Sequence, residues 1–479
     1  MKIAFAASEA APFLKTGGLG DVMQALPEAL RRDPKNEVAL VLPYYAVIKQ
    51  NPEVKTEFCT SFAVTMGWRS SHVGLFRLKH RKKRLQVLFV DNEQYFGRGA
   101  IYGEPDDGER FAFFSKAVPA CLNAVGFWPD VLHCNDWQTA LIPLLLKSEY
   151  AAAFPYMKSV LTIHNVQYQG WGDILFNMDV LGLPAEYTGV LEMKGASNML
   201  KAGIVMADAV TTVSETYAKE LQYPYYAHGL DRVLRDFSYK ITGVTNGIDT
   251  KVWDPAHDAA LAAPYSVADA AEEKRKNKLA LQKELGLNAD ADTALLAMVT
   301  RLADHKGIDL LTYIADRLME RRVQLVVLGT GEREYEDFLS GLAARNPGKV
   351  SAVLQFNGGL ANRIYAASDV YLMPSKSEPC GLSQLIAMRY GSVPVVHATG
   401  GLQDTVPPYE GPEGQGRGFT FQSYNADDFL AAIDRALAVY YDTPEAWEQL
   451  RKWDMQQDLS WKIPAQKYVE LYRQLTGKE

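Results

Sequence analysis

Short apolar runs alternate with longer amphipathic stretches along most of the chain. From residue 294 onward, stretches with helical periodicity such as IDLLTYIADRLMERR, LIAMRYG and DDFLAAIDRALAVYY separate the apolar runs LLAMVTR, VQLVVLG, AVLQF, VYLMP and PVVHA. Continuous apolar runs of strand length are typical of parallel strands buried on both faces, because helices cover both sides of such a sheet. The alternation predicts a doubly wound α/β domain.

The first half of the chain shows the same alternation less evenly. KIAFAAS, EVALVLPYY, DVLHCND, SVLTIHN and AVTTVS have the composition of parallel strands, with helical stretches between them. The runs SHVGLFRLKH and RLQVLFVDN alternate and flank a basic cluster at residues 80–84, which predicts a β-hairpin with a solvated turn. A targeting or nucleic-acid-binding role for the cluster is the alternative.

The domain boundary is predicted at the Asn-Gly turn in GVTNGIDTKVWDP. This gives two Rossmann-like domains, residues 1–248 and 249–455, which we expect to face each other across a cleft. The stretch 258–292 is rich in Ala, Asp and Lys, which predicts surface helix and loop. The tail 456–479 contains the amphipathic run LSWKIPAQKYVELYRQL, and we expect this helix to pack back on the first domain.

Composition narrows the class of protein. The chain has 479 residues, of which 48% are hydrophobic and 22% charged, as in soluble globular proteins of more than one domain. The formal net charge of −7 argues against a general binder of nucleic acid or anionic membranes. No apolar run approaches the roughly 20 residues of a membrane helix, and we interpret the N-terminus as a buried strand rather than a signal peptide.

The cysteines indicate the compartment. The 4 cysteines are scattered, without a CxxC motif or paired spacing. They form neither a disulfide framework nor a zinc site, and they suit a reducing environment. The sequence therefore predicts a cytoplasmic protein.

Motifs at the carboxyl ends of strands carry the most weight, because ligands bind there in open α/β sheets. The first is KTGGLGD at residues 15–21, between strand KIAFAAS and helix VMQALPEALRR. Glycines let the backbone approach a ligand, amides at a helix start favour anions, and Lys15 adds a charge. A tight strand-to-helix turn is the alternative.

The second motif is RLADHKG, at the end of strand LLAMVTR. It places Arg301 and Lys306 on either side of a short loop. Two such cations suit a diphosphate, since Arg offers a bidentate fork and Lys a compact charge. A solvated surface pair is the alternative.

The third motif is SEPCGLS at residues 377–383, between strand VYLMP and helix LSQLIAMRYG. The amides of Gly381, Leu382 and Ser383 are expected to point at an anion. Glu378 would repel a phosphate, so we expect its carboxylate to serve the sugar, where positive charge develops in the transition state. A helix-capping Glu is the alternative.

Polar residues also end two strands of the first domain. HCNDW and IHNVQYQG bring His133, Asp136, His164 and Gln167 near one another. No ligand set with metal-binding spacing is present, so hydrogen bonds to sugar hydroxyls explain them better. A buried, hydrogen-bonded histidine is the alternative for His164 and the favoured interpretation for His133.

Two further motifs are predicted to carry no chemistry. Gly329-Thr330-Gly331 follows a strand, but it lacks the third glycine and the acidic residue of a dinucleotide fingerprint. Asp290 and Asp292 match a DxD pattern, yet they lie in a loop before a strand, away from any carboxyl end.

With these motifs assembled, the chain resembles the bacterial and plant glycogen and starch synthases. These are retaining glycosyltransferases with two facing Rossmann-like domains, the GT-B architecture. The resemblance extends over essentially the whole chain, through KTGGLGDV, HCNDW, TIHNVQYQG, TVSETYAKEL, NGIDTKVWDP, TRLADHKGIDLL, NRIYAASDVYLMPSKSEPCGLSQL, GGLQDTV and GFTF.

The resemblance implies roles for individual residues. Arg301 and Lys306 would bind the diphosphate, Glu378 would be the essential acidic residue near the glucosyl group, and His164 would hold the donor glucose. The first domain would bind the acceptor, with Asp136 and Tyr95 near it, and the second the nucleotide sugar. The donor-binding residues that it implies are Lys15, Gly18, Asp21, Asn246, Phe356, Arg363, Cys380, Gly381, Leu382 and Ser383.

The implied reaction transfers glucose from ADP-glucose to the non-reducing 4-hydroxyl of an α-1,4-glucan with retention, without a metal or pyridoxal phosphate. Phe356 stands where many family members have a Tyr beside the adenine, so stacking is retained without the hydroxyl. Arg417 and Glu215 are also departures, and they leave the nucleotide preference open. The alternatives are a related glucosyltransferase that uses UDP-glucose and a catalytically silent glucan-binding paralogue; the sequence does not decide the oligomeric state.

Overall fold

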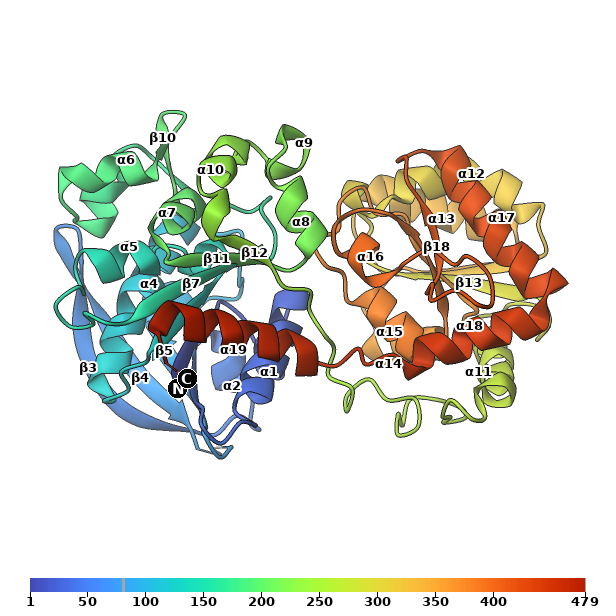
Figure 1. Ribbon diagram of the computed structural model, residues 1–479, viewed down its shortest axis with the longest axis horizontal. Coiled ribbons are helices and arrows are strands. Elements are labelled where there is room, and N and C mark those ends of the chain that lie inside the picture. Colours follow the sequence, from blue (N-terminus) through green and yellow to red (C-terminus); the bar gives the residue numbers. More distant parts are fainter. Residues whose placement is uncertain (80–81, 479) are drawn as a thin grey trace. The chain divides into compact units, whose positions relative to one another are not determined.

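The structure, a computed structural model, describes residues 1–79 and 82–478 and divides the chain into two compact units (Figure 1). The first unit comprises Met1–Asn246 and Trp461–Glu479, and the second comprises Gly247–Ser460. The sequence-based boundaries, after residue 248 and at residue 456, lie close to the two points where the chain passes from one unit to the other. The α/β fold class with parallel sheets is confirmed in both units.

The first unit is built on a 9-stranded sheet in the order β12-β11-β7-β6-β1-β2-β5-β4-β3. Its inner strands pair in parallel and are almost wholly buried, as the continuous apolar runs predict. The strands are β1 (Lys2–Ala6), β2 (Glu37–Pro43), β3 (Thr56–Met66), β4 (Arg69–Leu78), β5 (Leu85–Asp91), β6 (Val131–Asn135), β7 (Lys158–Ile163), β11 (Ala209–Thr212) and β12 (Ile241–Gly243).

The strand order creates a switch point between β1 and β6. From β1 the chain passes to β2, continues to the far edge at β3 and returns through β4 to β5 beside β2, and it later places β6 on the other side of β1. Loops at the carboxyl ends of two such strands diverge in opposite directions and leave a crevice for a ligand. The first unit therefore presents its natural binding position after β1 and β6.

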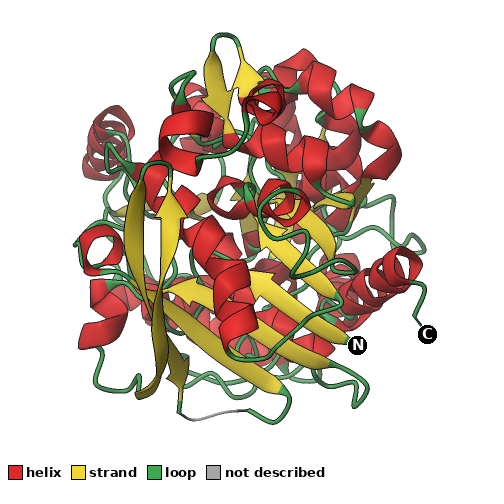
Figure 2. Ribbon diagram, turned by 90° about the vertical axis from the view of Figure 1, so that its left-hand side faces the viewer, coloured by secondary structure: helices red, strands yellow, loops and turns green. Residues whose placement is uncertain are grey.

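One edge of this sheet is antiparallel. The predicted hairpin is confirmed, since β4 pairs antiparallel with β5, and Figure 2 shows the long strands of this edge. His80 and Arg81 of the basic cluster lie outside the described residues. The sequence did not predict β3, which pairs antiparallel with β4, because its half-exposed side chains carry no continuous apolar run.

Helices cover both faces of the first sheet. The C-terminal helix belongs to this unit and lies beside the first helix (Figure 1). A small separate sheet of β8 (Trp171–Gly172), β10 (Ala196–Asn198) and β9 (Glu192–Met193) also belongs to the unit. The helices are α1 (Gly18–Leu30), α2 (Ala46–Gln50), α3 (Glu93–Phe96), α4 (Asp107–Ala124), α5 (Ile142–Lys147), α6 (Thr188–Leu191), α7 (Met199–Met206), α8 (Glu215–Glu220), α9 (Pro224–Ala227), α10 (Asp231–Asp236) and α19 (Lys462–Thr476).

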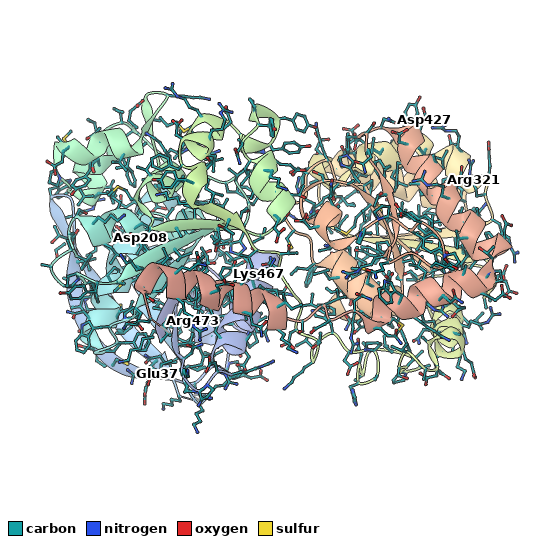
Figure 3. All side chains as sticks on the ribbon, viewed as in Figure 1. Glu37, Asp208, Arg321, Asp427, Lys467 and Arg473 are labelled. Carbon is teal, nitrogen blue, oxygen red and sulfur yellow. The ribbon has the colours of Figure 1, made fainter. Side chains whose placement is uncertain are left out.

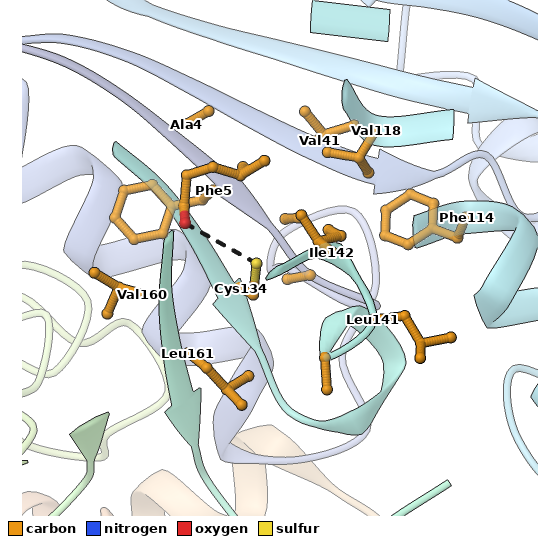
Figure 4. Close-up of a cluster of buried hydrophobic side chains, with 14 of the residues drawn as sticks. Ala4, Phe5, Val41, Phe114, Val118, Cys134, Leu141, Ile142, Val160 and Leu161 are labelled. Carbon is orange, nitrogen blue, oxygen red and sulfur yellow. Dashed lines mark hydrogen bonds between the residues drawn. The ribbon is translucent and has the colours of Figure 1, made fainter. Parts of the chain in front are cut away.

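The core of the first unit lies directly beneath its switch point. Figure 4 shows Phe5 of β1 and Cys134 of β6 packed with side chains of α4 and α5, including Phe114 and Ile142. All of these side chains are fully buried. The loops that follow β1 and β6 are therefore anchored on a rigid base.

The second unit has a fully parallel 6-stranded sheet in the order β15-β14-β13-β16-β17-β18. The five predicted strands are all present, and β18 is an additional short strand at the edge. The switch point falls between β13 and β16, because the chain moves outward from β13 through β14 and β15 before it returns to β16. The strands are β13 (Ala294–Val299), β14 (Val323–Leu328), β15 (Val350–Val353), β16 (Val370–Met373), β17 (Val393–His397) and β18 (Phe419–Phe421).

Amphipathic helices flank the second sheet. One of them, α11, occupies the stretch for which surface helix and loop are predicted. No helix in the described ranges has both the length and the apolar character needed to cross a membrane. The helices are α11 (Ala270–Glu284), α12 (Ile308–Met319), α13 (Arg333–Arg345), α14 (Gly358–Ala367), α15 (Ser383–Arg389), α16 (Gly400–Thr405), α17 (Ala426–Asp442) and α18 (Pro444–Gln456).

Candidate active site

The second unit brings Lys306 and Glu378 together at its switch point. Lys306 lies in the loop after β13 and Glu378 in the loop after β16, and Lys306 Nζ is 2.7 Å from Glu378 Oε2. The same oxygen accepts a hydrogen bond from Ser375 Oγ at 3.0 Å. The main chain also joins the two loops, since the Lys376 amide donates to the His305 carbonyl at 2.9 Å. Glu378 is therefore part of an ion pair rather than a simple helix cap.

Arg301 lies just beyond the end of β13, the strand that leads to Lys306. Its side chain is exposed, and within residues 1–79 and 82–478 it forms neither a hydrogen bond nor an ion pair. A guanidinium at a switch point can bind a phosphate with two parallel hydrogen bonds. Of the two predicted cations, Lys306 is held by a carboxylate and Arg301 is available.

The loop that carries Glu378 is braced by the start of α16. The Gly401 amide donates to the Glu378 carbonyl at 3.0 Å. A Cβ at Gly400, whose φ is +46°, would lie 2.1 Å from the same carbonyl oxygen. Only glycine allows this approach, so the GGLQD motif serves to hold the Glu378 loop in place.

The predicted amide cluster follows Glu378. Gly381 has a left-handed φ of 70°, Leu382 is the N-cap, and α15 begins at Ser383. In the part of the chain that the structure describes, the amides of these three residues donate no hydrogen bond. Cys380 is buried beside them. The loop therefore presents free donors near an ion pair, as an anion site requires.

The two predicted nucleotide contacts differ in their surroundings. Phe356 lies just beyond β15 and is 90% exposed, which is unusual for a large apolar side chain and leaves a ring face open for stacking. Arg363 on α14 instead forms a bidentate ion pair with Glu284 of α11, at 2.9 and 2.7 Å. Arg363 would have to leave Glu284 before it could contact a nucleotide.

In the first unit, Asp136 and His164 lie together at the ends of β6 and β7. Asp136 Oδ1 accepts hydrogen bonds from the amides of His164, at 2.7 Å, and Asn165, at 3.2 Å. Desolvation raises the pKa of Asp136 to about 7, although these hydrogen bonds oppose the shift. Asp136 has a φ of +58° and a ψ of −175°, a strained combination for a residue with a side chain.

His164 is a neutral imidazole at physiological pH. Burial lowers its pKa to about 3. Its Nε2 is 2.9 Å from Asn135 Oδ1, and the Asn135 amide nitrogen donates to the carbonyls of Ala6 and His133. This orientation makes Asn135 Oδ1 an acceptor, so His164 Nε2 carries the proton and Nδ1 remains an acceptor. Asn246 offers a further hydrogen-bond acceptor, because its side chain is buried and its Oδ1 has no partner among the described residues.

The segment 15–21 differs from its prediction. Helix α1 begins at Gly18, inside the motif rather than after it, and an internal carboxylate already binds one amide of its first turn. Glu9 accepts hydrogen bonds from the Thr16 and Gly20 amides, at 2.7 and 3.2 Å. The Thr16 and Gly20 amides are therefore not available to a ligand anion, and contact between the rest of the segment and the donor stays a prediction. Lys15 forms an exposed ion pair with Asp21 at 2.8 Å.

Other predicted residues are not brought into these groups. His133 is fully buried, with Nδ1 2.6 Å from the Tyr472 hydroxyl and Nε2 2.5 Å from Thr162 Oγ1. It is a buried, hydrogen-bonded core histidine, as the sequence favours for it, and its ring makes no contact with Asp136 among the described hydrogen bonds. Tyr95 is buried, and its hydroxyl donates to Glu109 at 2.5 Å. Gln167 is exposed.

The two motifs expected to carry no chemistry have structural roles. Asp290 accepts hydrogen bonds from the Asp292 and Thr293 amides and closes its own loop. The glycine pair after β14 packs against the loop that follows β13, where the Leu302 amide donates to the Thr330 carbonyl at 2.9 Å. Across residues 1–79 and 82–478, no three His, Cys, Asp or Glu side chains gather as metal ligands.

The fold is that of a known class of enzyme. The chain superimposes on the catalytic domain of starch synthase IV from Arabidopsis thaliana, with a TM-score of 0.90 at 34% identity over 100% of this chain and 99% of that one. Sucrose-phosphate synthase from Thermosynechococcus elongatus shares the fold, with a TM-score of 0.61 at 20% identity over 99% of each chain. This is the two-domain GT-B glycosyltransferase architecture.

Sequence comparison defines the family. The starch synthase catalytic domain matches residues 2–236, and the glycosyl transferases group 1 domain matches residues 281–452. The glycogen synthase of Clostridium beijerinckii is 46% identical over 100% of both chains, and that of Bacillus cereus strain Q1 is 43% identical over 99% of this chain and 100% of its own. The chain belongs to the glycogen synthase family, and it transfers glucosyl groups in glycogen or starch synthesis.

Sequence reasoning missed several residues of these sites. Ser375 orients Glu378, Asn135 sets the tautomer of His164, and Glu9 holds the segment 15–21. Glu9 did carry a signal, since an acidic residue directly after a buried first strand lies at a carboxyl end. Ser375 and Asn135 are polar residues at such ends as well, but only the strand order shows which ends are adjacent.

Proposed function

We propose that the protein transfers glucose from ADP-glucose to the non-reducing 4-hydroxyl of an α-1,4-glucan, with retention of configuration. The observation that carries the proposal is the charge arrangement at the second switch point, where exposed Arg301 lies at the end of the strand that leads to the Lys306–Glu378 pair. The starch synthase IV structure, 34% identical over the whole chain, is described as bound to ADP and acarbose, which supports ADP as the nucleotide.

In this proposal the second unit binds the diphosphate. Arg301 supplies a bidentate contact, Lys306 a compact charge, and the amides of Gly381, Leu382 and Ser383 further donors. Preorganised donors of this kind stabilise the negative charge that grows on a leaving phosphate, and each is worth roughly 10²–10³ in rate. Because these residues already provide positive charge, we propose that the reaction needs neither a metal ion nor pyridoxal phosphate.

Glu378 has two tasks in the proposed reaction. Through Oε2 it holds Lys306, at 2.7 Å, in the position where the phosphate arrives. Its other oxygen, Oε1, accepts no hydrogen bond from the described residues, and its negative charge can stabilise the positive charge that develops on the glucosyl C1. An interaction that strengthens only in the transition state raises kcat rather than ground-state affinity.

The chemical step exchanges one bond at the anomeric carbon for another. The bond between C1 and the β-phosphate oxygen breaks, and the 4-hydroxyl oxygen of the acceptor bonds to C1 on the same face. The hydroxyl proton passes to the departing phosphate oxygen, so ADP leaves as the conjugate acid. No oxidant, reductant or further reactant is consumed.

In the first unit we propose that hydrogen-bond acceptors hold the sugars. His164 Nδ1 and Asn246 Oδ1 are acceptors for hydroxyls of the donor glucose, and Asp136 is a stronger acceptor beside the glucan. Lys15, Gly18 and Asp21 are proposed to contact the donor. Tyr95 is proposed near the acceptor, although its own hydroxyl is bound to Glu109.

Nucleotide release tests the proposal. ADP-glucose and UDP-glucose are each supplied with glycogen as acceptor in excess EDTA, and nucleoside diphosphate and chain extension are measured together. We expect turnover with ADP-glucose at undiminished rate in EDTA, with release of ADP and extension of the glucan through new α-linkages. Preference for UDP-glucose, or activity that EDTA abolishes and Mg²⁺ restores, would contradict the donor or the metal-free mechanism respectively.

A further inference from the structure

Glu9 is a buried carboxylate outside the donor and acceptor residues discussed above. It follows β1 at the switch point of the first unit and is only 3% exposed. Oε2 accepts hydrogen bonds from both the amide and the hydroxyl of Thr16, each at 2.7 Å, and Oε1 accepts one from the Gly20 amide at 3.2 Å. Burial raises its pKa, and the hydrogen bonds from the loop partly offset that rise.

These contacts tie the two ends of one short loop to a single side chain. Thr16 directly follows Lys15, and Gly20 directly precedes Asp21. The ends approach so closely that a Cβ at Gly20 would lie 2.4 Å from Lys15 Cβ. Glu9 thus closes the loop from inside, and the Lys15–Asp21 ion pair closes it from outside.

The two closures differ in strength. The Lys15 and Asp21 side chains are 41% and 30% exposed, and exposed ion pairs contribute little to stability because water and salt screen them. Hydrogen bonds from backbone amides to a buried carboxylate are charge-assisted and shielded from water. The hydrogen bonds to Glu9 therefore keep the two ends of the loop together even when a ligand separates Asp21 from Lys15.

Glu9 also decides which groups the loop presents outward. Its carboxylate occupies the Thr16 amide before α1 and the Gly20 amide in the first turn, so those two amides are unavailable to a donor phosphate. Lys15 and the open backbone at Gly18 remain. A lysine side chain loses conformational entropy when it is immobilised, and a fixed Cα position limits that loss to the side chain itself.

We propose that Glu9 is the positioning residue of the donor site in the first unit: it holds the loop of residues 15–21 closed, so that Lys15 reaches the nucleotide sugar, without touching the substrate. This rests on the proposed function, in which Lys15 contacts the donor. Glu9 acts through Lys15, so its loss affects donor affinity and leaves the acceptor site intact.

The test compares Glu9→Gln with a matched control, Asp208→Asn. Asp208, labelled in Figure 3, accepts hydrogen bonds from the amide and hydroxyl of Ser159, at 2.7 and 2.9 Å, as Glu9 does from Thr16. It lies at the amino end of β11, away from the switch point. The measurements are donor KM, acceptor KM, kcat and Tm, with the nucleotide glucose that the parental protein turns over.

Glu9→Gln keeps one acceptor oxygen but turns an NH₂ group toward a loop amide, which opens the loop at one end. We expect the donor KM to rise about tenfold or more, the usual effect of a lost charge-assisted hydrogen bond, with acceptor KM within about twofold of the parent. Asp208→Asn should lower Tm without changing either KM.

Equal donor KM values in Glu9→Gln, Asp208→Asn and the parent would overturn the proposal and make Glu9 a clamp that serves stability alone. If Glu9→Gln does not fold, Thr16→Val removes one donor to Glu9 and keeps the side-chain shape. Its donor KM should rise about two- to fivefold, and an unchanged value would likewise overturn the proposal. Absence of turnover by the parental protein with any nucleotide glucose would instead contradict the proposed function.

Discussion

The two units share the same type of fold, but different groups bind the carboxylates at their switch points. In the first unit, Glu9 and Asp136 at the switch point are held by backbone amides. In the second unit, Glu378 is held by the side chain of Lys306, and Arg301 lies exposed at the same edge. Carboxyl oxygens that backbone amides hold in place can accept hydrogen bonds from sugar hydroxyls, whereas an ion pair with a second cation nearby can admit a phosphate. We infer that the first unit is the sugar-binding half and the second the phosphate-binding half. Lys15 is the residue of the first half that we propose as a cationic contact to the donor.

The largest expected effect comes from removing the charge of Glu378. Glu378→Gln keeps the shape and the contact with Ser375, but it no longer opposes the positive charge on the glucosyl C1. We expect kcat to fall by at least about 10², while ADP affinity stays the same or increases, because Lys306 loses its anionic partner. Single-turnover kinetics beside calorimetric ADP titration measures both.

Ser375→Ala is the control for that variant, since it deletes only the hydrogen bond to Glu378 Oε2. It should lower kcat by about tenfold or less. A Glu378→Gln protein with near-parental kcat would make Glu378 a structural ion-pair partner and would contradict the assignment of the reaction centre to the second unit.

The next effect concerns Asp136 and its pKa of about 7, compared with 3.8 for an ordinary Asp. For a raised pKa, the stability gained by protonation is complete below 3.8 and is lost as the pH rises through about 7. Asp136→Asn keeps the acceptor oxygen for the His164 and Asn165 amides without the charge. We expect the variant to gain stability over the parent between pH 5 and pH 8 by up to about 4 kcal/mol.

Thermal melts of both proteins across that pH interval measure the difference. Asp136→Asn should also lose most of its activity on glucan, because the amide that replaces the carboxyl group cannot act as a charged acceptor. A stability difference that does not change with pH would show that Asp136 is ionised normally and is not the buried carboxylate of the sugar-binding half.

The smallest expected effect is at Phe356. Phe356→Ala removes the exposed ring beyond β15, and a lost stacking contact is worth about 0.5–1.5 kcal/mol. We therefore expect the donor KM to rise about two- to tenfold, with the acceptor KM unchanged. Tyr313→Ala, on α12, removes another exposed ring of this unit and is the control. Identical donor KM values in both variants would exclude Phe356 from the nucleotide site.

The fold was largely predictable because buried parallel strands carry a strong signal. β1, β2, β6 and β7 and the inner strands of the second unit are continuous apolar runs, and each corresponds to a predicted strand. β3 gave no such signal, since it lies at an antiparallel edge with half-exposed side chains. The strand order was not readable, because the apolar runs are interchangeable in composition and only packing selects their neighbours.

The position of Arg301, Lys306 and Glu378 at the carboxyl edge of the second sheet was predictable, because each of them follows a strand. Their pairing was not, since Lys306 and Glu378 are separated by 72 residues. The partner of the buried His133 was likewise not predictable, since Tyr472 lies 339 residues away, on the C-terminal helix. A histidine at a strand end has the same local sequence whether it faces a ligand or the core.

The division of labour between the two units is tested most directly by calorimetric titration of ADP into matched arginine variants of the second unit. Arg301→Ala removes the exposed guanidinium at the switch point, and Arg317→Ala removes one that pairs with Asp427 in the last turn of α12. We predict that Arg301→Ala weakens ADP binding by about tenfold or more and that Arg317→Ala leaves it unchanged. Parental ADP affinity in Arg301→Ala would contradict the account, because the second switch point would then not be the phosphate site.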